Sequence, residues 1–168
     1  MEIILHNVPK LILLMAIAGM LGILPQTLAV WIPFIVIRRY SAGLHARNGY
    51  MCTIMTLLMF AVVPYFFQNI SINITSLGIV FFVVAVCLNK YAPADTANRP
   101  ILGYNKRKKL KRSALLAACI IFMVTLFFVE ARYHLLVAIG SSYATMAILP
   151  ITYKILNRSV NNYEKYER

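Results

Sequence analysis

The sequence predicts an all-α, polytopic integral membrane helical bundle, and three observations lead to this fold class. Of the 168 residues, 61% are hydrophobic and 13% are charged, whereas soluble domains are roughly half apolar and about a quarter charged. The apolar residues gather in about five segments that approach the length of a membrane span. The cations behind the net charge of +12 lie between those segments, which is typical of cytoplasmic loops and argues against a nucleic-acid-binding protein.

The first apolar segment, residues 11–37, has two interpretations. The stretch between Lys10 and Arg38 is 27 residues without a charge, enough for one tilted helix of about 40 Å. Pro25 lacks an N–H and clashes with the preceding turn. The segment therefore also fits two short helices that meet near residues 24–26 as a re-entrant hairpin. The sequence alone leaves both alternatives open.

Four more segments complete a single transmembrane domain over residues 1–168. Segments 51–67 and 77–88 flank a polar, uncharged stretch and predict a tight helical hairpin. Residues 89–113 carry 8 of the 17 Lys and Arg residues, which predicts a basic cytoplasmic loop. A fourth segment, 114–129, and a fifth, 135–153, follow on either side of a short external turn, and the C-terminal tail returns to the cytoplasm.

A histidine and a cysteine lie close in sequence where a basic stretch becomes apolar: R-R-Y-S-A-G-L-H-A-R-N-G-Y-M-C at 38–52. A cysteine nucleophile needs its thiolate form, which an imidazole, nearby cations and a helix N-terminus favour. With Asn48 as N-cap, Cys52 would lie about one turn into its helix. His45 would be about 10 Å away along a shared helix, so we expect it on a turn folded back over that helix.

A simpler interpretation of the same residues also stands. A cysteine at the start of an apolar helix often serves as a small hydrophobe, and a histidine beside arginines often lies at the membrane interface. The three histidines, His6, His45 and His134, are far apart in sequence, so we expect no metal site and no cofactor.

Two stretches of the chain resemble the AgrB family, the accessory gene regulator membrane peptidases of Gram-positive bacteria. They are residues 38–52 and K-Y-A-P-A-D-T-A-N-R-P-I at 90–101, followed by the basic K-R-K-K-L-K-R. The resemblance implies a cysteine endopeptidase, a hydrolase of the bacterial cell membrane with its active site facing the cytoplasm. His45 and Cys52 match the family's catalytic pair, and Arg38 and Gly43 match motif positions around it.

The resemblance also implies a substrate, an AgrD-like quorum-sensing precursor with an amphipathic leader and an acidic C-terminal tail. In the family mechanism the cysteine releases that tail and holds the remainder as an acyl-thioester. A cysteine or serine of the precursor then closes a thiolactone or lactone ring, giving the autoinducing peptide. An acidic tail would be attracted to a cluster of cations, namely Lys106, Arg107, Lys108, Lys109, Lys111 and Arg112, whose simpler role is to keep the loop inside.

The third catalytic group is left open by the sequence. Gln26 and Asn48 are candidates for orienting the imidazole or stabilising an oxyanion. Asp95, the only aspartate, would orient His45 if its loop folded back, although a turn role beside Pro93 is the simpler expectation.

A noncatalytic membrane protein, either a peptide exporter or a scaffold subunit, is the alternative function, and the break at Pro25 favours it. Expected partners are the precursor peptide and the lipid bilayer, without nucleic acid. A homodimer is a further expectation, because the last segment contains small residues that allow close helix packing, namely Ser141, Ser142 and Ala144.

Overall fold

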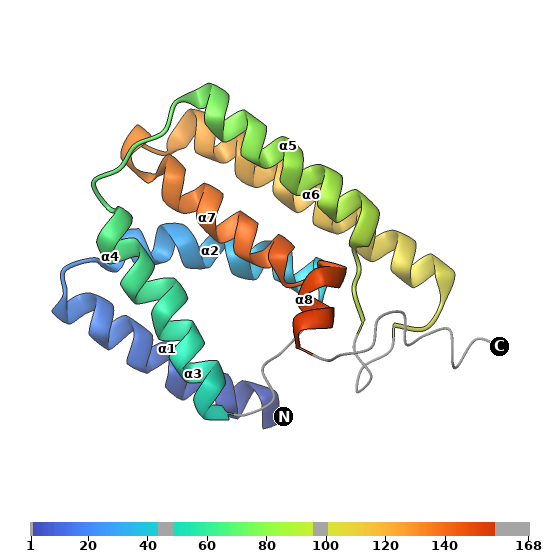
Figure 1. Cartoon of the computed structure of the whole chain (residues 1–168), viewed down its shortest axis with the longest axis horizontal. Coiled ribbons are helices and arrows are strands. Elements are labelled where there is room, and N and C mark those ends of the chain that lie inside the picture. The colour runs from blue at the N-terminus through green and yellow to red at the C-terminus, as the bar shows by residue number, and fades with distance from the viewer. Residues whose placement is uncertain (1, 44–48, 96–100, 157–168) are drawn as a thin grey trace.

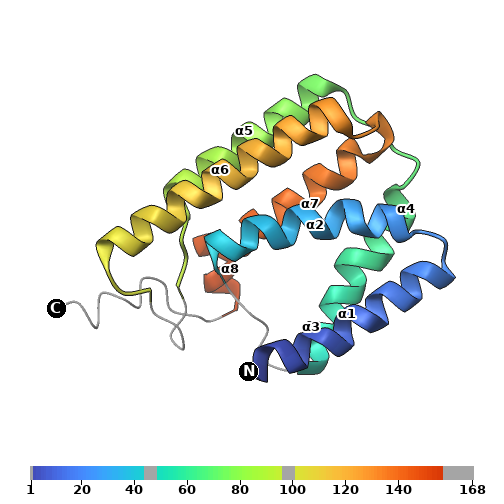
Figure 2. The same cartoon turned by 180° about the vertical axis from the view of Figure 1, so that it is seen from behind.

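A computed structural model describes residues 2–43, 49–95 and 101–156. Regular secondary structure in these ranges is helical, which confirms the predicted all-α bundle. Figures 1 and 2 show α5 and α6 side by side, with α2 and α7 next to them and α1 and α3 on the far side of the molecule. Helix α2 packs mainly against α7 and then α6, while α5 packs against both α6 and α7.

The first apolar segment forms two helices, α1 (Glu2–Met20) and α2 (Leu24–Ser41). The chain turns between them at Gly22, whose φ of 69° lies in the left-handed region that glycine adopts most easily. Pro25 lies in the first turn of α2, where its missing N–H disrupts no helical bond. The structure therefore agrees with the two-helix alternative, with the break slightly earlier than residues 24–26.

Both apolar segments of the predicted tight hairpin are helical, but they diverge from the loop that joins them (Figure 1), and α5 packs against α6 and α7 instead. The first is a continuous helix built from α3 (Gly49–Leu57), a π-helical stretch (Leu58–Val62) and α4 (Val63–Phe67). Pro64 accounts for the wider turn, because a proline ring clashes with the carbonyl four residues before it and removes one helical hydrogen bond. The second is α5 (Ile74–Tyr91), which is longer than the expected 77–88.

The prediction that residues 89–113 form a loop was wrong. Helix α6 (Tyr104–Phe128) begins well inside that range, and its first turns carry most of the basic residues. Lysine, arginine and leucine are good helix formers, and long cationic side chains can extend to water from a helix that continues into a membrane. Charge alone therefore did not locate the start of the helix.

The fifth segment, expected as one span over 135–153, is also interrupted. A short 3-10 turn (Ala131–Tyr133) leads into α7 (His134–Met146), and a separate helix, α8 (Pro150–Ile155), follows. Leu149 has extended backbone angles, as expected for a residue before proline. The break at residues 147–149 leaves α7 with 13 residues, too few for a bilayer crossing that needs about 20.

Three helices in the described ranges are long and apolar enough to span a membrane, Tyr50–Phe67, Ile74–Tyr91 and Tyr104–Phe128, and Val8–Met20 is a shorter apolar helix. Large apolar side chains on these helices are exposed, such as Phe128 at 84%, which suits contact with lipid. The chain thus has the helices of a membrane protein, with fewer full-length spans than the five segments suggested.

The small residues of the last apolar segment allow α7 to pack closely against α2 of the same chain. A Cβ at Gly140 would collide with the carbonyl oxygen of Val30, so these backbones can approach only because residue 140 is glycine. Ser141 and Ala144 are fully buried, and the hydroxyls of Ser141 and Ser142 bond to carbonyls one turn earlier in α7. Ser141 and Ala144 are therefore not available to pack against a second copy.

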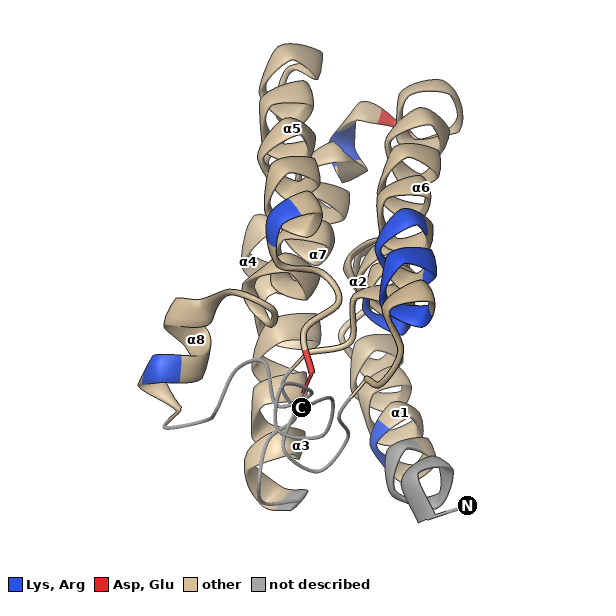
Figure 3. Cartoon of the chain, turned by 90° about the vertical axis from the view of Figure 1, so that its right-hand side faces the viewer, with Lys and Arg blue, Asp and Glu red and all other residues tan. Residues whose placement is uncertain are grey.

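Cations gather at one end of the bundle (Figure 3). Arg38 and Arg39 lie in the last turn of α2, Lys90 ends α5, and Lys154 ends α8. The basic start of α6 lies at the same end, whereas the turn between α6 and α7 is at the opposite end. We call the first region the basic end.

Candidate active site

Cys52 is the fourth residue of α3, at the N-terminal end of the long helix that continues to Phe67. Its side chain is partly buried, and its carbonyl accepts a 2.7 Å hydrogen bond from Thr56 Oγ1. The backbone N–H groups of the first helical turn direct partial positive charge toward this position. The predicted partner His45 and the predicted N-cap Asn48 lie outside the described residues.

Arg38, in the last turn of α2, is a partly buried cation of this region. Its guanidinium carbon lies 5.6 Å from the centroid of the Phe34 ring. Burial lowers the pKa of Arg38, and the negative charges of ionised Tyr153 and Cys52 partly oppose that shift. An arginine remains protonated under these conditions. Arg38 therefore places a permanent positive charge within electrostatic reach of Cys52.

Gly43 is the last described residue before the segment that contains His45. Its φ is +102°, and a Cβ there would lie 2.7 Å from the carbonyl oxygen of Ala147 and 3.1 Å from Cγ2 of Ile148. Both the backbone angle and the lack of space require glycine. The motif position that matched by resemblance thus has a structural reason: the chain passes directly against the junction between α7 and α8.

The segment after α5 folds back onto the end of α2. Ala42 and Ala94 form an isolated parallel β-bridge, in which Ala94 N–H donates to the Ser41 carbonyl at 3.0 Å and Gly43 N–H donates to the Ala94 carbonyl at 2.9 Å. Asp95 follows directly and is only 4% exposed. Residues 92–95 therefore lie against the end of α2, and the orienting role of Asp95 toward His45 stays a prediction.

Tyr153 joins this cluster from α8, and the sequence analysis missed it. Its side chain is fully buried, and its hydroxyl donates a 2.9 Å hydrogen bond to the carbonyl of Asp95. Burial raises the pKa of Tyr153 to about 12, the Asp95 charge adds to that effect and Arg38 opposes it. The phenol is therefore a hydrogen-bond donor at neutral pH. In the sequence, Tyr153 is a tyrosine among apolar residues, and nothing in the local pattern distinguishes it as a site residue.

The orienting or oxyanion role predicted for Gln26 was wrong. Its Nε2 lies 3.5 Å from Oε1 of Gln68, just after α4. The 16 positions from Cys52 to Gln68 correspond to about 24 Å of helix. Gln26 is consequently at the opposite end of the bundle from Cys52, where it can neither orient an imidazole near the thiol nor stabilise an oxyanion formed there.

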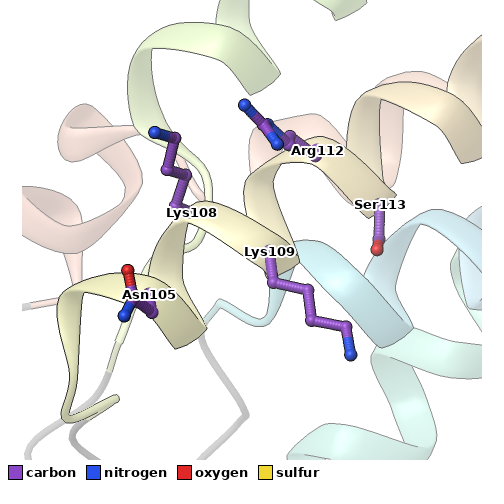
Figure 4. Close-up of a pocket in the computed structure, with 5 residues that line it drawn as sticks. All are labelled: Asn105, Lys108, Lys109, Arg112 and Ser113. Carbon is purple, nitrogen blue, oxygen red and sulfur yellow. The ribbon is translucent and has the colours of Figure 1, made fainter.

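The cations predicted to receive the substrate's tail lie on the first turns of α6. Figure 4 shows that Lys108, Lys109 and Arg112 point in different directions around a shallow surface that Asn105 and Ser113 also line. Arg107 Nη1 instead donates to the carbonyl of Ile101 at 3.1 Å. The other two predicted residues, Lys106 and Lys111, lie on the same helix. The arrangement is a broad basic surface rather than a closed anion site.

Nothing in the described ranges brings three or more His, Cys, Asp or Glu residues together as a metal site. His134, the one histidine whose side chain is described, is buried at the opposite end of the molecule, with Nε2 3.1 Å from the carbonyl oxygen of Val129.

The family model described as accessory gene regulator B (AgrB) matches residues 1–154. The chain belongs to the AgrB family. It is 40% identical over 167 residues to an AgrB-like protein of Listeria innocua and 41% identical to one of Listeria monocytogenes serovar 1/2a, covering 99% of this chain and 82% of each relative. Accessory gene regulator protein B of Staphylococcus lugdunensis is 28% identical over 151 residues, which cover 90% of this chain and 79% of that protein. No solved structure matches the chain.

Membership of the AgrB family connects the chain with the accessory gene regulator quorum-sensing system and with its AgrD-type peptide. The three candidate spans agree with a protein of the bilayer.

Proposed function

We propose that this AgrB-family protein is a membrane cysteine endopeptidase that removes the C-terminal tail of an AgrD-like precursor. The observation that carries the proposal is the position of Cys52, which is at the N-terminal end of α3 and within electrostatic reach of the partly buried Arg38. Cys87 instead lies near the C-terminal end of α5, and Cys119 lies in the middle of α6, so neither is at a helix N-terminus. A helix N-terminus and a cation are the surroundings that favour a reactive thiolate.

In the proposed reaction His45 takes the thiol proton of Cys52, and the sulfur attacks the carbonyl carbon of the scissile peptide bond. The carbon–nitrogen bond then breaks as the protonated imidazole returns its proton to the leaving amine. The products of this step are the free tail, with a new amino terminus, and a precursor joined to Cys52 as a thioester. Arg38 would stabilise the thiolate before attack.

A thiol or hydroxyl of the precursor then attacks the thioester carbonyl and loses its proton to His45. The ring closes as a thiolactone or lactone, the bond to sulfur breaks, and the proton returns to Cys52. No net oxidation or reduction occurs, so this sequence requires no redox cofactor.

The charge distribution supports a cytoplasmic site and an acidic substrate tail. Under the positive-inside rule the basic end faces the cytoplasm, and this end holds the last turn of α2, which carries Arg38. The basic surface of α6 would concentrate an acidic tail near the membrane.

A peptide exporter is the second candidate, and the two interrupted apolar segments favour it. The chain breaks between α1 and α2 and again between α7 and α8, and discontinuous helices are common in transporters. An exporter would leave the covalent structure of the precursor unchanged, whereas a peptidase would shorten it.

The test is to co-express the chain with a candidate precursor and measure the peptide mass. We expect a shortened or cyclised product with the native chain and none with Cys52→Ala or His45→Ala. Cys87→Ala and Cys119→Ala are the matched controls and should process the precursor normally. Processing that persists in Cys52→Ala would refute the nucleophile assignment, and an unmodified precursor appearing outside the cell would favour the exporter.

A further inference from the structure

Helix α6 carries a stripe of exposed residues that changes from basic to apolar along one face. Lys109 and Arg112 lie in its first turns, and four apolar residues follow them at intervals of three or four. Positions with this spacing share one face of a helix. The four are Leu116, Ile120, Met123 and Phe127, and each is between 50% and 71% exposed. We call these six residues the α6 stripe.

The α6 stripe lies opposite the face through which α6 joins the bundle. Ala114, Ala118 and Thr125 are buried, and their helical positions are about half a turn away from those of the stripe. Ala114 and Ala118 belong to a core cluster that also contains Ile37 of α2 and Val84 of α5. The α6 stripe therefore faces away from α2 and α5.

The change from basic to apolar residues matches the depth of one membrane leaflet. Helix α6 has 25 residues, and a bilayer crossing needs about 20, so its first turns extend beyond the hydrocarbon. A leaflet is about 15 Å deep, or about ten residues of helix. Leu116, Ile120 and Met123 follow Arg112 within that distance. They consequently lie in the same leaflet whose surface meets the two cations.

Polar groups that suit a phosphate surround these cations. Asn105 and Ser113 line the same shallow hollow as Lys108, Lys109 and Arg112 (Figure 4). An amide and a hydroxyl can each donate a hydrogen bond, and both guanidinium and ammonium groups bind phosphate. The described residues that line this hollow include no carboxylate.

We propose that the α6 stripe binds one anionic phospholipid of the cytoplasmic leaflet, with its phosphate at Lys109 and Arg112 and an acyl chain along Leu116, Ile120 and Met123. A neutral lipid would match the apolar part of the stripe alone, and a soluble acidic peptide would match the cations alone. An anionic phospholipid matches both. The other lysines of α6 stay available to a precursor's tail, and the inference does not depend on the proposed peptidase function.

The test measures which lipid lies beside the α6 stripe. Trp31→Phe removes the one tryptophan of the chain, and Leu116→Trp introduces an indole about one turn after Arg112. The full chain is reconstituted in phosphatidylcholine vesicles that contain brominated phosphatidylglycerol or brominated phosphatidylcholine, and fluorescence quenching is compared. We expect phosphatidylglycerol to be preferred about three- to tenfold at this position, and Lys109→Gln with Arg112→Gln to remove the preference.

Val86→Trp, also in the Trp31→Phe background, is the matched control on α5. Val86 is 50% exposed and lies one turn before Lys90, the basic residue in the last turn of that helix. This position repeats the arrangement with one cation in place of two, so we expect a preference below about twofold. An equal preference at both positions would show a general attraction to the basic end and would overturn a specific site on α6.

Two further measurements separate the charges from folding. Lys109→Arg with Arg112→Lys keeps both charges and should keep the preference. Should the glutamine variant fail to fold, as judged by circular dichroism, the Leu116→Trp protein with both native cations is measured at about 1 M salt, where the screening length is about 3 Å. The preference should then fall by at least about twofold. A preference that survives both the loss of the charges and high salt would overturn the proposal.

Two other outcomes would assign the cations to a different ligand. Displacement of phosphatidylglycerol by inorganic phosphate at millimolar concentration would show a site for free phosphate and would overturn the lipid assignment. Equal quenching by the two lipids in the Leu116→Trp protein would also overturn it, leaving Lys109 and Arg112 to the precursor's acidic tail.

Discussion

Both ends of the bundle contain polar residues, but the polar side chains find their hydrogen-bonding and charged partners in different ways. At the end opposite the basic one, Glu130 and Arg132 form a 2.7 Å ion pair with both side chains mostly exposed, and His134 contacts a carbonyl five residues away. At the basic end Asp95 is buried and Arg38 is partly buried, and a hydrogen bond from Tyr153 to the Asp95 carbonyl joins parts of the chain far apart in sequence.

This difference indicates which end of the bundle is the better candidate for a catalytic site. An exposed ion pair contributes little to stability, so the Glu130–Arg132 pair needs no functional explanation. Burial of a charge is costly, and buried charges in a specific arrangement concentrate at functional sites. The four predictions below test whether the basic end alone carries the proposed activity.

The largest effect is expected from Gly43→Ala. The new Cβ would meet the Ala147 carbonyl at 2.7 Å, and the residue would have to keep a φ of +102°. We expect a loss of about 1–3 kcal/mol in stability and a processing rate reduced about 100-fold, since small displacements of reacting groups have large costs. Thermal unfolding in detergent and a processing assay measure both. Gly78→Ala, on α5 with open space around it, should be neutral, and equal losses in the two variants would contradict the packing argument.

A smaller effect is expected from Arg38→Gln. Removing this partly buried charge should slow alkylation of Cys52 at pH 7 by on the order of tenfold, measured in a chain that retains Cys52 as its one cysteine. Arg39→Gln removes a neighbouring but exposed charge and should change the rate less than about twofold. Identical behaviour of the two variants would show that overall charge, rather than the position of Arg38, governs the thiol.

The basic surface of α6 should affect binding rather than the chemical step. In a chain with Lys108→Gln, Lys109→Gln and Arg112→Gln, KM for an acidic precursor should rise about three- to tenfold at low salt, and its salt dependence should weaken. Arg132→Gln, at the opposite end, is the matched control. An unchanged KM with a reduced kcat would argue that these residues act on the reaction itself.

The smallest effect is expected from Gln26→Ala. Gln26 contacts Gln68, about 24 Å along the helix from Cys52, so the processing rate should change less than about twofold. A loss greater than tenfold, in a variant whose thermal unfolding is normal, would break the distinction between the two ends and restore Gln26 as a catalytic candidate.

Sequence reasoning succeeded where the pattern is local and continuous. The apolar parts of α5 and α6 were predicted from unbroken apolar runs at 77–88 and 114–129, and Pro25 gave two helices as one of the two alternatives for residues 11–37. No break was predicted at Pro150, because apolar residues continue on both sides of it. The break before α8 was therefore missed. The start of α6 was missed because cations suit a loop and a helix equally well.

The same holds for single residues of the candidate site: local motifs were recognised from the sequence, whereas contacts between distant segments were not. Cys52, Arg38 and Gly43 belong to one short motif, and the structure gives Gly43 a steric reason and Arg38 an electrostatic one. Tyr153 contributes through a bond to a backbone carbonyl 58 residues away, and such a contact leaves no periodic signal. Gln26 was misassigned because its distance from Cys52 depends on the path of the helices. The pairing of His45 with Cys52 stays a prediction.

The short length of α7 affects how much water reaches the proposed acyl-enzyme. Its 13 residues extend about 20 Å, against about 30 Å of hydrocarbon in a bilayer, and α6 continues beyond the end of α7 in Figure 1. The junction that Gly43 touches is thus set back along the bundle from the basic start of α6. In the proposed reaction, a thioester formed near this junction would meet less water than one at the surface. Ring closure by the precursor's own thiol or hydroxyl would then compete favourably with hydrolysis.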